Sequence, residues 1–127
     1  MLLMQTPGRM LTALGCVILA IAVAAEAYAA HGLSAHAAPA LVIRFERATH
    51  YLIVHGLALI GLAAQLRTPI QRIAIGVVIL GLSLFAGGLS LSVFWPDTGW
   101  TRMAPLGGSL MIFGWLGLAA GFALQRR

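Results

Sequence analysis

The sequence contains no lysine and no asparagine, only one cysteine and only three acidic residues. Without lysine, neither a Schiff base nor a phosphate-binding loop ending in Gly-Lys-Ser/Thr can form. Without asparagine there is no acceptor for N-glycosylation. Cys16 lies inside an apolar run. An internal disulfide, a CxxC site and a multi-cysteine metal cluster are therefore excluded, and Cys16 is expected to be a small buried apolar side chain.

Charged residues of either sign are also scarce. Of the 127 residues only 9% are charged and 61% are hydrophobic, and the mean hydropathy is +0.97. About a quarter of an ordinary globular chain is charged. The composition therefore predicts an integral membrane protein that forms one compact unit rather than a water-soluble domain.

The net charge of +5 comes from eight arginines against Glu26, Glu46 and Asp97. The arginines stand singly or in pairs between apolar runs and form no basic stripe that could follow a phosphate backbone. This distribution argues against nucleic-acid binding and is typical of residues that anchor helix ends at a membrane surface.

Four segments are long and apolar enough to cross a bilayer core about 30 Å thick, which requires roughly 20 helical residues. They are residues 11–30, 49–66, 73–95 and 106–124. Arg67-Thr68-Pro69 and the turn residues 95–100 make short connections, so neighbouring spans should be antiparallel. The sequence predicts an all-α membrane protein, one domain over residues 1–127, with four transmembrane helices in an up-down-up-down four-helix bundle.

The connection between the first two spans is longer than the others. Pro39 suits the first position of a helix, and Leu41, Phe45 and Ala48 share one face beyond it. These residues predict a short interfacial helix in the first loop, or else a lead-in to the second span.

The distribution of arginine predicts the orientation, because cytoplasmic loops are enriched in positive charge. The side of the termini has five arginines and the opposite side three. The five are Arg9, Arg67, Arg72, Arg126 and Arg127, and the three are Arg44, Arg47 and Arg102. Both termini are therefore expected in the cytoplasm.

The first apolar run has a second interpretation as a cleavable secretory signal, since Ala27-Tyr28-Ala29 is a small-x-small site. The run is longer than the 7 to 15 apolar residues of such signals, and Glu26 comes just before the site. A retained span is the favoured interpretation.

Two ionisable residues lie within the predicted spans, where a charged group costs roughly 2.5 to 3.5 kcal/mol at mid-depth. Glu26 is about 6 Å from the outer end of its span and His55 about 9 Å, at 1.5 Å per residue. Because the two spans are antiparallel neighbours, Glu26 and His55 could pair.

Helical spacing predicts which of the other polar residues share a face of the second span with His55. Tyr51 and His55 share a face at i, i+4, as do Glu46 and His50. His50 and His55 are 140° apart around the axis, so a regular helix cannot hold one metal between them. We expect Tyr51 and His55 to face the bundle, Glu46 and His50 to lie nearer water, and His31 to fold over the Tyr51–His55 pair.

The candidate polar cluster is therefore His31, Tyr51, His55, Glu26 and Glu46. Three interpretations stay open: hydrogen bonds that tie the first loop to the bundle, a proton relay or small-ligand site, and a metal site. No short chelating spacing supports a metal. No metal ligand, catalytic residue or cofactor is predicted.

Glycines provide a second pattern. Gly117 and Gly121 have GxxxG spacing, and Gly107 and Gly114 lie seven residues apart on a similar face. Small residues let membrane helices approach closely. These four glycines are expected to pack helices inside the molecule, with docking to a partner or a second copy as the alternative.

Three stretches of the chain carry a set of ordered motifs. They are Ala27-Tyr28-Ala29-Ala30-His31-Gly32-Leu33; then Phe45-Glu46-Arg47-Ala48-Thr49-His50-Tyr51 with His55-Gly56-Leu57-Ala58-Leu59; and finally Phe85-Ala86-Gly87-Gly88-Leu89, Pro105-Leu106-Gly107-Gly108 and Gly114-Trp115. In order and spacing they resemble the family called domain of unknown function 423, related to transmembrane protein 256. The resemblance implies a four-span protein of the bacterial inner membrane and brings no reaction with it. Glu26, Gly88 and Ser90 depart from the family pattern.

The favoured function is a non-enzymatic component that packs with itself or with a larger membrane assembly, in contact with the lipid bilayer. The rival is a proton-coupled or small-ligand carrier that uses His31, Tyr51 and His55. An enzyme is the weakest hypothesis, because no nucleophile elbow, HExxH motif or paired-carboxylate spacing is present.

Overall fold

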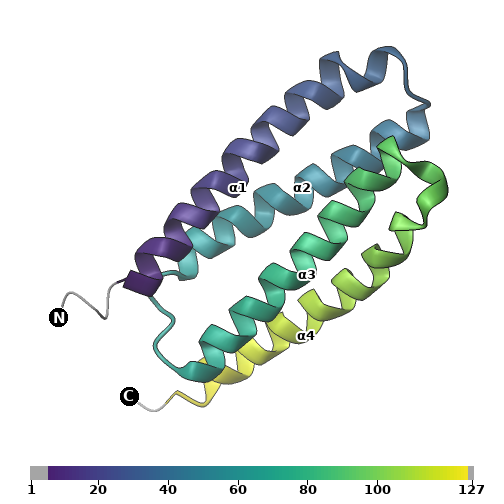
Figure 1. Cartoon of the computed structure of the whole chain (residues 1–127). Coiled ribbons are helices and arrows are strands. Elements are labelled where there is room, and N and C mark those ends of the chain that lie inside the picture. The colour runs from purple at the N-terminus through teal and green to yellow at the C-terminus, as the bar shows by residue number, and fades with distance from the viewer. Residues whose placement is uncertain (1–5, 126–127) are drawn as a thin grey trace.

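A computed structural model describes residues 6–125 and is built from four long helices, joined end to end by short connections. These are α1 (Thr6–His31), α2 (Pro39–Leu62), α3 (Pro69–Phe94) and α4 (Met103–Ala123). Consecutive helices run in opposite directions, and α1 begins at the end of the molecule where α4 finishes (Figure 1). Residues 6–125 contain no strand, so the predicted all-α class is confirmed.

Three helical segments are long and apolar enough to cross a membrane: Pro7–Ala35, Pro69–Phe94 and Trp100–Ala123. α2 has the length but not the apolar character, because Arg44, Glu46, Arg47 and His50 lie in its first half. That α2 crosses the membrane, as the second of the four predicted spans, thus stays a prediction.

The first loop differs from the expected short interfacial helix. Residues 39–48 form the first part of α2, which continues without a break to Leu62. Pro39 starts the helix, and the sequence places no proline or turn motif after it to end the helix early. Only the 3-10 turn η2 (Leu33–Ala35) lies between α1 and α2, so the lead-in alternative describes this segment.

The connection between α3 and α4 depends on one glycine. Two 3-10 turns, η3 (Pro96–Thr98) and η4 (Trp100–Arg102), meet at Gly99, which has a φ of 77°. An L-residue with a side chain pays roughly 1 to 2 kcal/mol in this left-handed region. Gly99 therefore allows the chain to reverse between the two helices.

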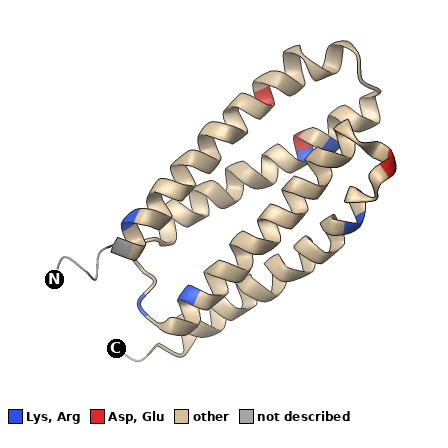
Figure 2. Cartoon of the chain, viewed as in Figure 1, with Lys and Arg blue, Asp and Glu red and all other residues tan. Residues whose placement is uncertain are grey.

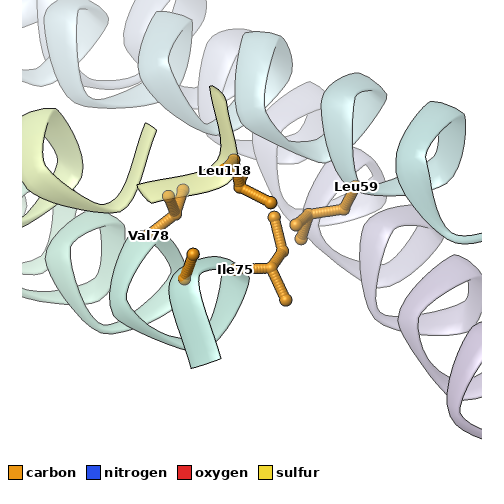
Figure 3. Packing of buried hydrophobic residues seen from close by; sticks show 5 residues of the cluster. Leu59, Ile75, Val78 and Leu118 are labelled. Atoms are coloured by element: carbon orange, nitrogen blue, oxygen red, sulfur yellow. The ribbon is translucent and has the colours of Figure 1, made fainter. Parts of the chain in front are cut away.

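The helices pack as two pairs. α1 packs mainly on α2 and α4 mainly on α3, and contacts between α2 and α3 join the pairs. Leu59 of α2, Ile75 and Val78 of α3, and Leu118 of α4 point toward one another in the core between the pairs (Figure 3). Much of α1 is consequently uncovered by protein. Cys16 lies on that uncovered surface, so the expectation that it is buried is wrong.

Glycine brings α3 and α4 close together. A Cβ added to Gly107 would lie 2.5 Å from the carbonyl oxygen of Gly81, and one added to Gly114 would lie 2.6 Å from a methyl carbon of Val78. A Cβ added to Gly121 would lie 3.0 Å from Cγ of Gln71 in α3, and one added to Gly117 would lie 3.2 Å from Cβ of Ala74. The glycines singled out in the sequence thus line the internal contact between α3 and α4.

Candidate functional site

The charged residues lie toward the two ends of the molecule, and the acidic ones lie toward only one of them (Figure 2). The chain's three acidic side chains, Glu26, Glu46 and Asp97, lie toward the end where α1 passes into α2 and α3 into α4, which we call the acidic end. Arg9, Arg67 and Arg72 lie at the other end, which we call the arginine end. Arg126 and Arg127, also predicted on that side, are outside the described residues.

Glu26 of α1 is bonded to α2. The hydroxyl group of Thr49, which is almost completely buried, donates to a carboxylate oxygen of Glu26, and it also lies 2.8 Å from the backbone oxygen of Glu46. A buried polar group costs free energy unless it has a hydrogen-bond partner. The Glu26–Thr49 bond therefore satisfies both groups and joins α1 to α2.

His55 is buried and makes hydrogen bonds through both ring nitrogens. Its Nδ1 lies 2.9 Å from the backbone oxygen of Tyr51. On its other side, Nε1–H of Trp115 in α4 donates to Nε2 over 3.2 Å. The rings of Tyr51 and His55 stack with 5.8 Å between their centroids, and the Trp115 ring is tilted by 49° against His55 with 5.7 Å between centroids.

These partners specify one tautomer of His55. An indole N–H only donates, so Nε2 must accept, and a backbone oxygen only accepts, so Nδ1 must carry the hydrogen. The bonds are satisfied by the neutral ring. Both ring nitrogens of His55 are thus engaged in hydrogen bonds within the protein.

The structure does not bring together all members of the predicted cluster. The expected Glu26–His55 pairing is absent: Glu26 bonds Thr49, and His55 bonds Trp115 and the Tyr51 carbonyl. Glu46 and His50 are exposed on α2. The sequence could not place these partners because they depend on how each helix is rotated about its axis.

His31 does not fold over the Tyr51–His55 pair. It is exposed at the end of α1, five residues beyond Glu26 toward the acidic end, whereas His55 is six residues from Thr49 in the opposite direction. At 1.5 Å per residue, about 16 Å of helix separates the levels of the two histidines. The expected His31–Tyr51–His55 site is thus not assembled.

Three further residues make polar contacts between helices that were not predicted from the sequence: Trp115, Arg44 and Gln71. Trp115 has no local signal, because its partner is 60 residues away in the chain. Arg44 donates to the buried hydroxyl group of Ser92 at 3.3 Å, which links α2 to α3. Gln71 was detectable, because Thr68-Pro69-Ile70-Gln71 has the spacing of a capping box.

Gln71 is completely buried and bonded at both ends of its amide. Its oxygen accepts from the backbone N–H groups of Arg67 and Thr68, and its nitrogen donates to the Gly121 carbonyl and to Gln125. The Gln71 side chain therefore caps the start of α3 and also bonds α3 to the end of α4.

Side chains suited to a metal do not gather in the part of the chain that the structure describes, residues 6–125: no group of three or more His, Cys, Asp or Glu forms there. A hollow beside the aromatic stack is lined by His50, Tyr51, Val54 and His55. Of its lining side chains, His55 already has hydrogen-bond partners at both ring nitrogens.

The comparisons with known proteins identify the family. A family described as "Protein of unknown function (DUF423)" matches residues 25–108. The chain belongs to this family. The resemblance seen in the motifs is thus confirmed.

Two curated relatives agree with this assignment. A UPF0382 membrane protein of Haemophilus influenzae (strain ATCC 51907 / DSM 11121 / KW20 / Rd) is 31% identical over 102 residues, which cover 78% of this chain and 82% of the relative. A UPF0382 membrane protein of Staphylococcus aureus (strain bovine RF122 / ET3-1) is 31% identical over 105 residues, 81% and 86% respectively. No solved structure matches. Because the relatives are named membrane proteins and three helical segments of this chain are long and apolar enough to cross a membrane, we conclude that this chain is a membrane protein.

Proposed function

We propose that the protein is a non-enzymatic component of the bacterial inner membrane, with four spans and both termini in the cytoplasm, that acts by packing with a second copy or a larger membrane assembly. The observation that carries the proposal is the hydrogen bonding of His55. Its two ring nitrogens are occupied by Trp115 and the Tyr51 carbonyl, so the most buried ionisable side chain serves structure rather than chemistry.

The other buried polar groups support the same conclusion. Thr49 is bonded to Glu26, Ser92 to Arg44, and the Gln71 side chain to the Gly121 carbonyl of α4. Each of these bonds joins two helices. Polar side chains between membrane helices commonly have this structural role.

A surface remains for the packing partner. Gly107, Gly114 and Gly121 are used inside the molecule, but a hollow between α3 and α4 is lined by Ile70, Ile73, Phe113 and Gly117. Ile73 and Phe113 are among the most exposed large apolar side chains of the chain. A helix of a second copy could enter this hollow.

Mass measurement in a mild detergent tests the proposal. We expect the full-length protein to be a dimer or larger, or to copurify with partners at fixed ratio. Phe113→Ala removes an exposed side chain that lines the hollow and should reduce the protein toward the monomer, whereas Ile112→Ala, at an exposed position of α4 that does not line the hollow, should not. A strictly monomeric, partner-free protein would overturn the proposal.

Reconstituted vesicles test the carrier alternative. A carrier that uses His55 would lose its flux in the His55→Ala variant. We expect no proton flux above that of empty vesicles for either protein. Flux that disappears with His55→Ala would replace the packing proposal with the carrier.

A further inference from the structure

A large hollow lies at the arginine end. It has a volume of about 600 Å³ and is lined by the start of α1, the segment that follows α2, and the first turn of α3. Pockets that bind small molecules typically have about 300 to 1,000 Å³. Its lining residues include Arg9, Arg67 and Arg72, each from a different one of these segments. We call it the arginine pocket.

The arginine pocket has the charge to hold an anion. All three acidic side chains of the sequence lie toward the acidic end, so none neutralises these arginines locally (Figure 2). Gly8 and Arg9 belong to the first turn of α1, whose N–H groups lack intrahelical acceptors and carry the positive end of the helix dipole. Guanidinium groups beside a helix N-terminus suit a phosphate group.

The rest of the pocket lining is apolar, which distinguishes a lipid from a free anion. Pro7, Ala63, Ala64 and Leu66 lie beside the arginines. The pocket is also at the ends of α1 and α3, both long and apolar enough to cross a membrane. Positively charged pockets between helices on the cytoplasmic side of a membrane are typical binding sites of anionic lipid headgroups.

A second hollow, which could take an acyl chain, lies closer to the acidic end. This groove is lined by Leu14 and Ile18 of α1, Leu52 of α2, and residues of α3 that include Ile79, Ser83 and Gly87. Arg72, Ile79, Ser83 and Gly87 lie on one face of α3, at spacings of 7, 4 and 4 residues. A Cβ on Gly87 would meet nothing within 4 Å, so the groove is open toward the lipid.

We propose that the arginine pocket binds the phosphate headgroup of an anionic phospholipid, with one acyl chain lying in the groove between α1 and α3. Arg9, Arg67 and Arg72 hold the phosphate, and Leu14, Ile18 and Ile79 contact the chain. The proposal is independent of the packing function, because lipid binding is measured per chain and does not require a dimer.

The arginines are tested with phosphatidylglycerol added to the purified full-length protein in a non-ionic detergent. Native mass spectrometry counts bound lipid, and thermal melting measures its affinity. We expect one tightly retained phosphatidylglycerol per chain and no comparable retention of phosphatidylcholine. At about 1 kcal/mol per arginine near anionic lipid, or about fivefold in affinity, Arg9→Gln, Arg67→Gln and Arg72→Gln combined should weaken binding about a hundredfold.

Arg47→Gln is the matched control, because Arg47 is exposed and belongs to the acidic end. It removes one positive charge, as each of Arg9→Gln, Arg67→Gln and Arg72→Gln does alone, and should leave the affinity unchanged, whereas each of those single variants should weaken binding about fivefold. Equal binding of phosphatidylglycerol to the wild type and to the triple variant would overturn the proposal. A loss in Arg47→Gln equal to that in the single pocket variants would also overturn it, because net charge alone would then explain the binding.

Inorganic phosphate separates a lipid from a soluble anion. At matched ionic strength we expect phosphate to produce no saturable shift in melting temperature. A saturable shift equal to that with phosphatidylglycerol, and lost in the triple variant, would assign the pocket to a free phosphate compound and overturn the lipid.

The groove is tested by a pair of serines. Ser83 lines the groove, whereas Ser109 lies on α4 away from it; both are exposed and both bond the carbonyl oxygen four residues earlier at 2.9 Å. Ser83→Phe should fill the groove and weaken phosphatidylglycerol binding about tenfold, equivalent to roughly two methylene groups no longer buried. Ser109→Phe should bind normally. Equal binding by the two variants would overturn the placement of the acyl chain.

Discussion

Trp115 is the residue on which the internal polar contacts between α2 and α4 depend. Its N–H is the hydrogen-bond donor for Nε2 of buried His55. We expect Trp115→Phe to lower the free energy of unfolding by about 1 to 3 kcal/mol, because a buried acceptor loses its partner. Denaturant or thermal unfolding in detergent measures the change, with Trp100→Phe in exposed η4 as the control.

A double variant checks the physical reason. In Trp115→Phe with His55→Leu neither partner is left with an unmatched polar atom, and such pairs of replacements can be nearly neutral. The double variant should therefore be more stable than Trp115→Phe alone. If it is less stable by the sum of the two single losses, the hydrogen bond is not the cause.

Thr49 is the corresponding residue between α1 and α2. Thr49→Val keeps the shape of the side chain but removes the hydroxyl group that donates to Glu26. We expect a loss of about 1 to 3 kcal/mol in the free energy of unfolding, since Glu26 is left half-buried without this donor. Thr49→Ser retains the hydroxyl and should lose less than half as much. Similar losses in the two variants would show that packing rather than the hydrogen bond is lost.

At the scale of the helices, glycine sets the distance between α3 and α4. The Cβ in Gly107→Ala would be 2.5 Å from the carbonyl oxygen of Gly81, so the two helices must separate. Overpacking of this kind typically costs about 1 to 3 kcal/mol. Gly61→Ala is the control, because nothing lies within 4 Å of its Cβ, and alanine there should be neutral or stabilising by up to about 1 kcal/mol. Equal effects at both positions in thermal unfolding would contradict the close packing of α3 and α4.

The helices themselves were largely predictable from local sequence. Continuous apolar runs ended by Arg67-Thr68-Pro69 and by the turn at Pro96 place α1, α3 and α4 within a few residues of their observed bounds. The predicted second span begins at residue 49, ten residues after the start of α2. A helix from Pro39 was also predicted, but local sequence left open whether it is a separate interfacial helix or a lead-in to that span. The pairing of Glu26 with Thr49 and of His55 with Trp115 was beyond prediction, since it depends on helix rotation and register, which no local pattern specifies.

At the scale of the whole molecule, the direction of each connection is the testable property. In a Cys16→Ala background, Ala35→Cys and Thr98→Cys place a thiol in the α1–α2 and α3–α4 connections, and Gln65→Cys places one in the α2–α3 connection. We expect a membrane-impermeant thiol reagent to label the first two in intact cells. Gln65→Cys should react only after the membrane is opened, because we propose that α2 spans and that the termini are cytoplasmic.

The same experiment decides between other arrangements. Labelling of both Ala35→Cys and Gln65→Cys in intact cells would mean that α2 does not cross, as its polar first half allows. Labelling of Gln65→Cys alone would reverse the orientation. An osmotically lysed sample, in which all three positions react, controls for thiols hidden within the protein.

The separation of charge between the two ends also polarises the molecule electrically. Among the described residues, the arginine end carries three positive charges from Arg9, Arg67 and Arg72, whereas Arg44, Arg47 and Arg102 are balanced by three carboxylates at the acidic end. A respiring bacterium holds its interior at a negative voltage, and one elementary charge gains about 2.3 kcal/mol per 100 mV on crossing. Relative to the orientation we propose, with both termini in the cytoplasm, an inverted molecule would place these three cations on the unfavourable side, at a cost of about 7 kcal/mol per 100 mV. The voltage of the living cell would thus hold the protein in one direction long after its insertion is finished.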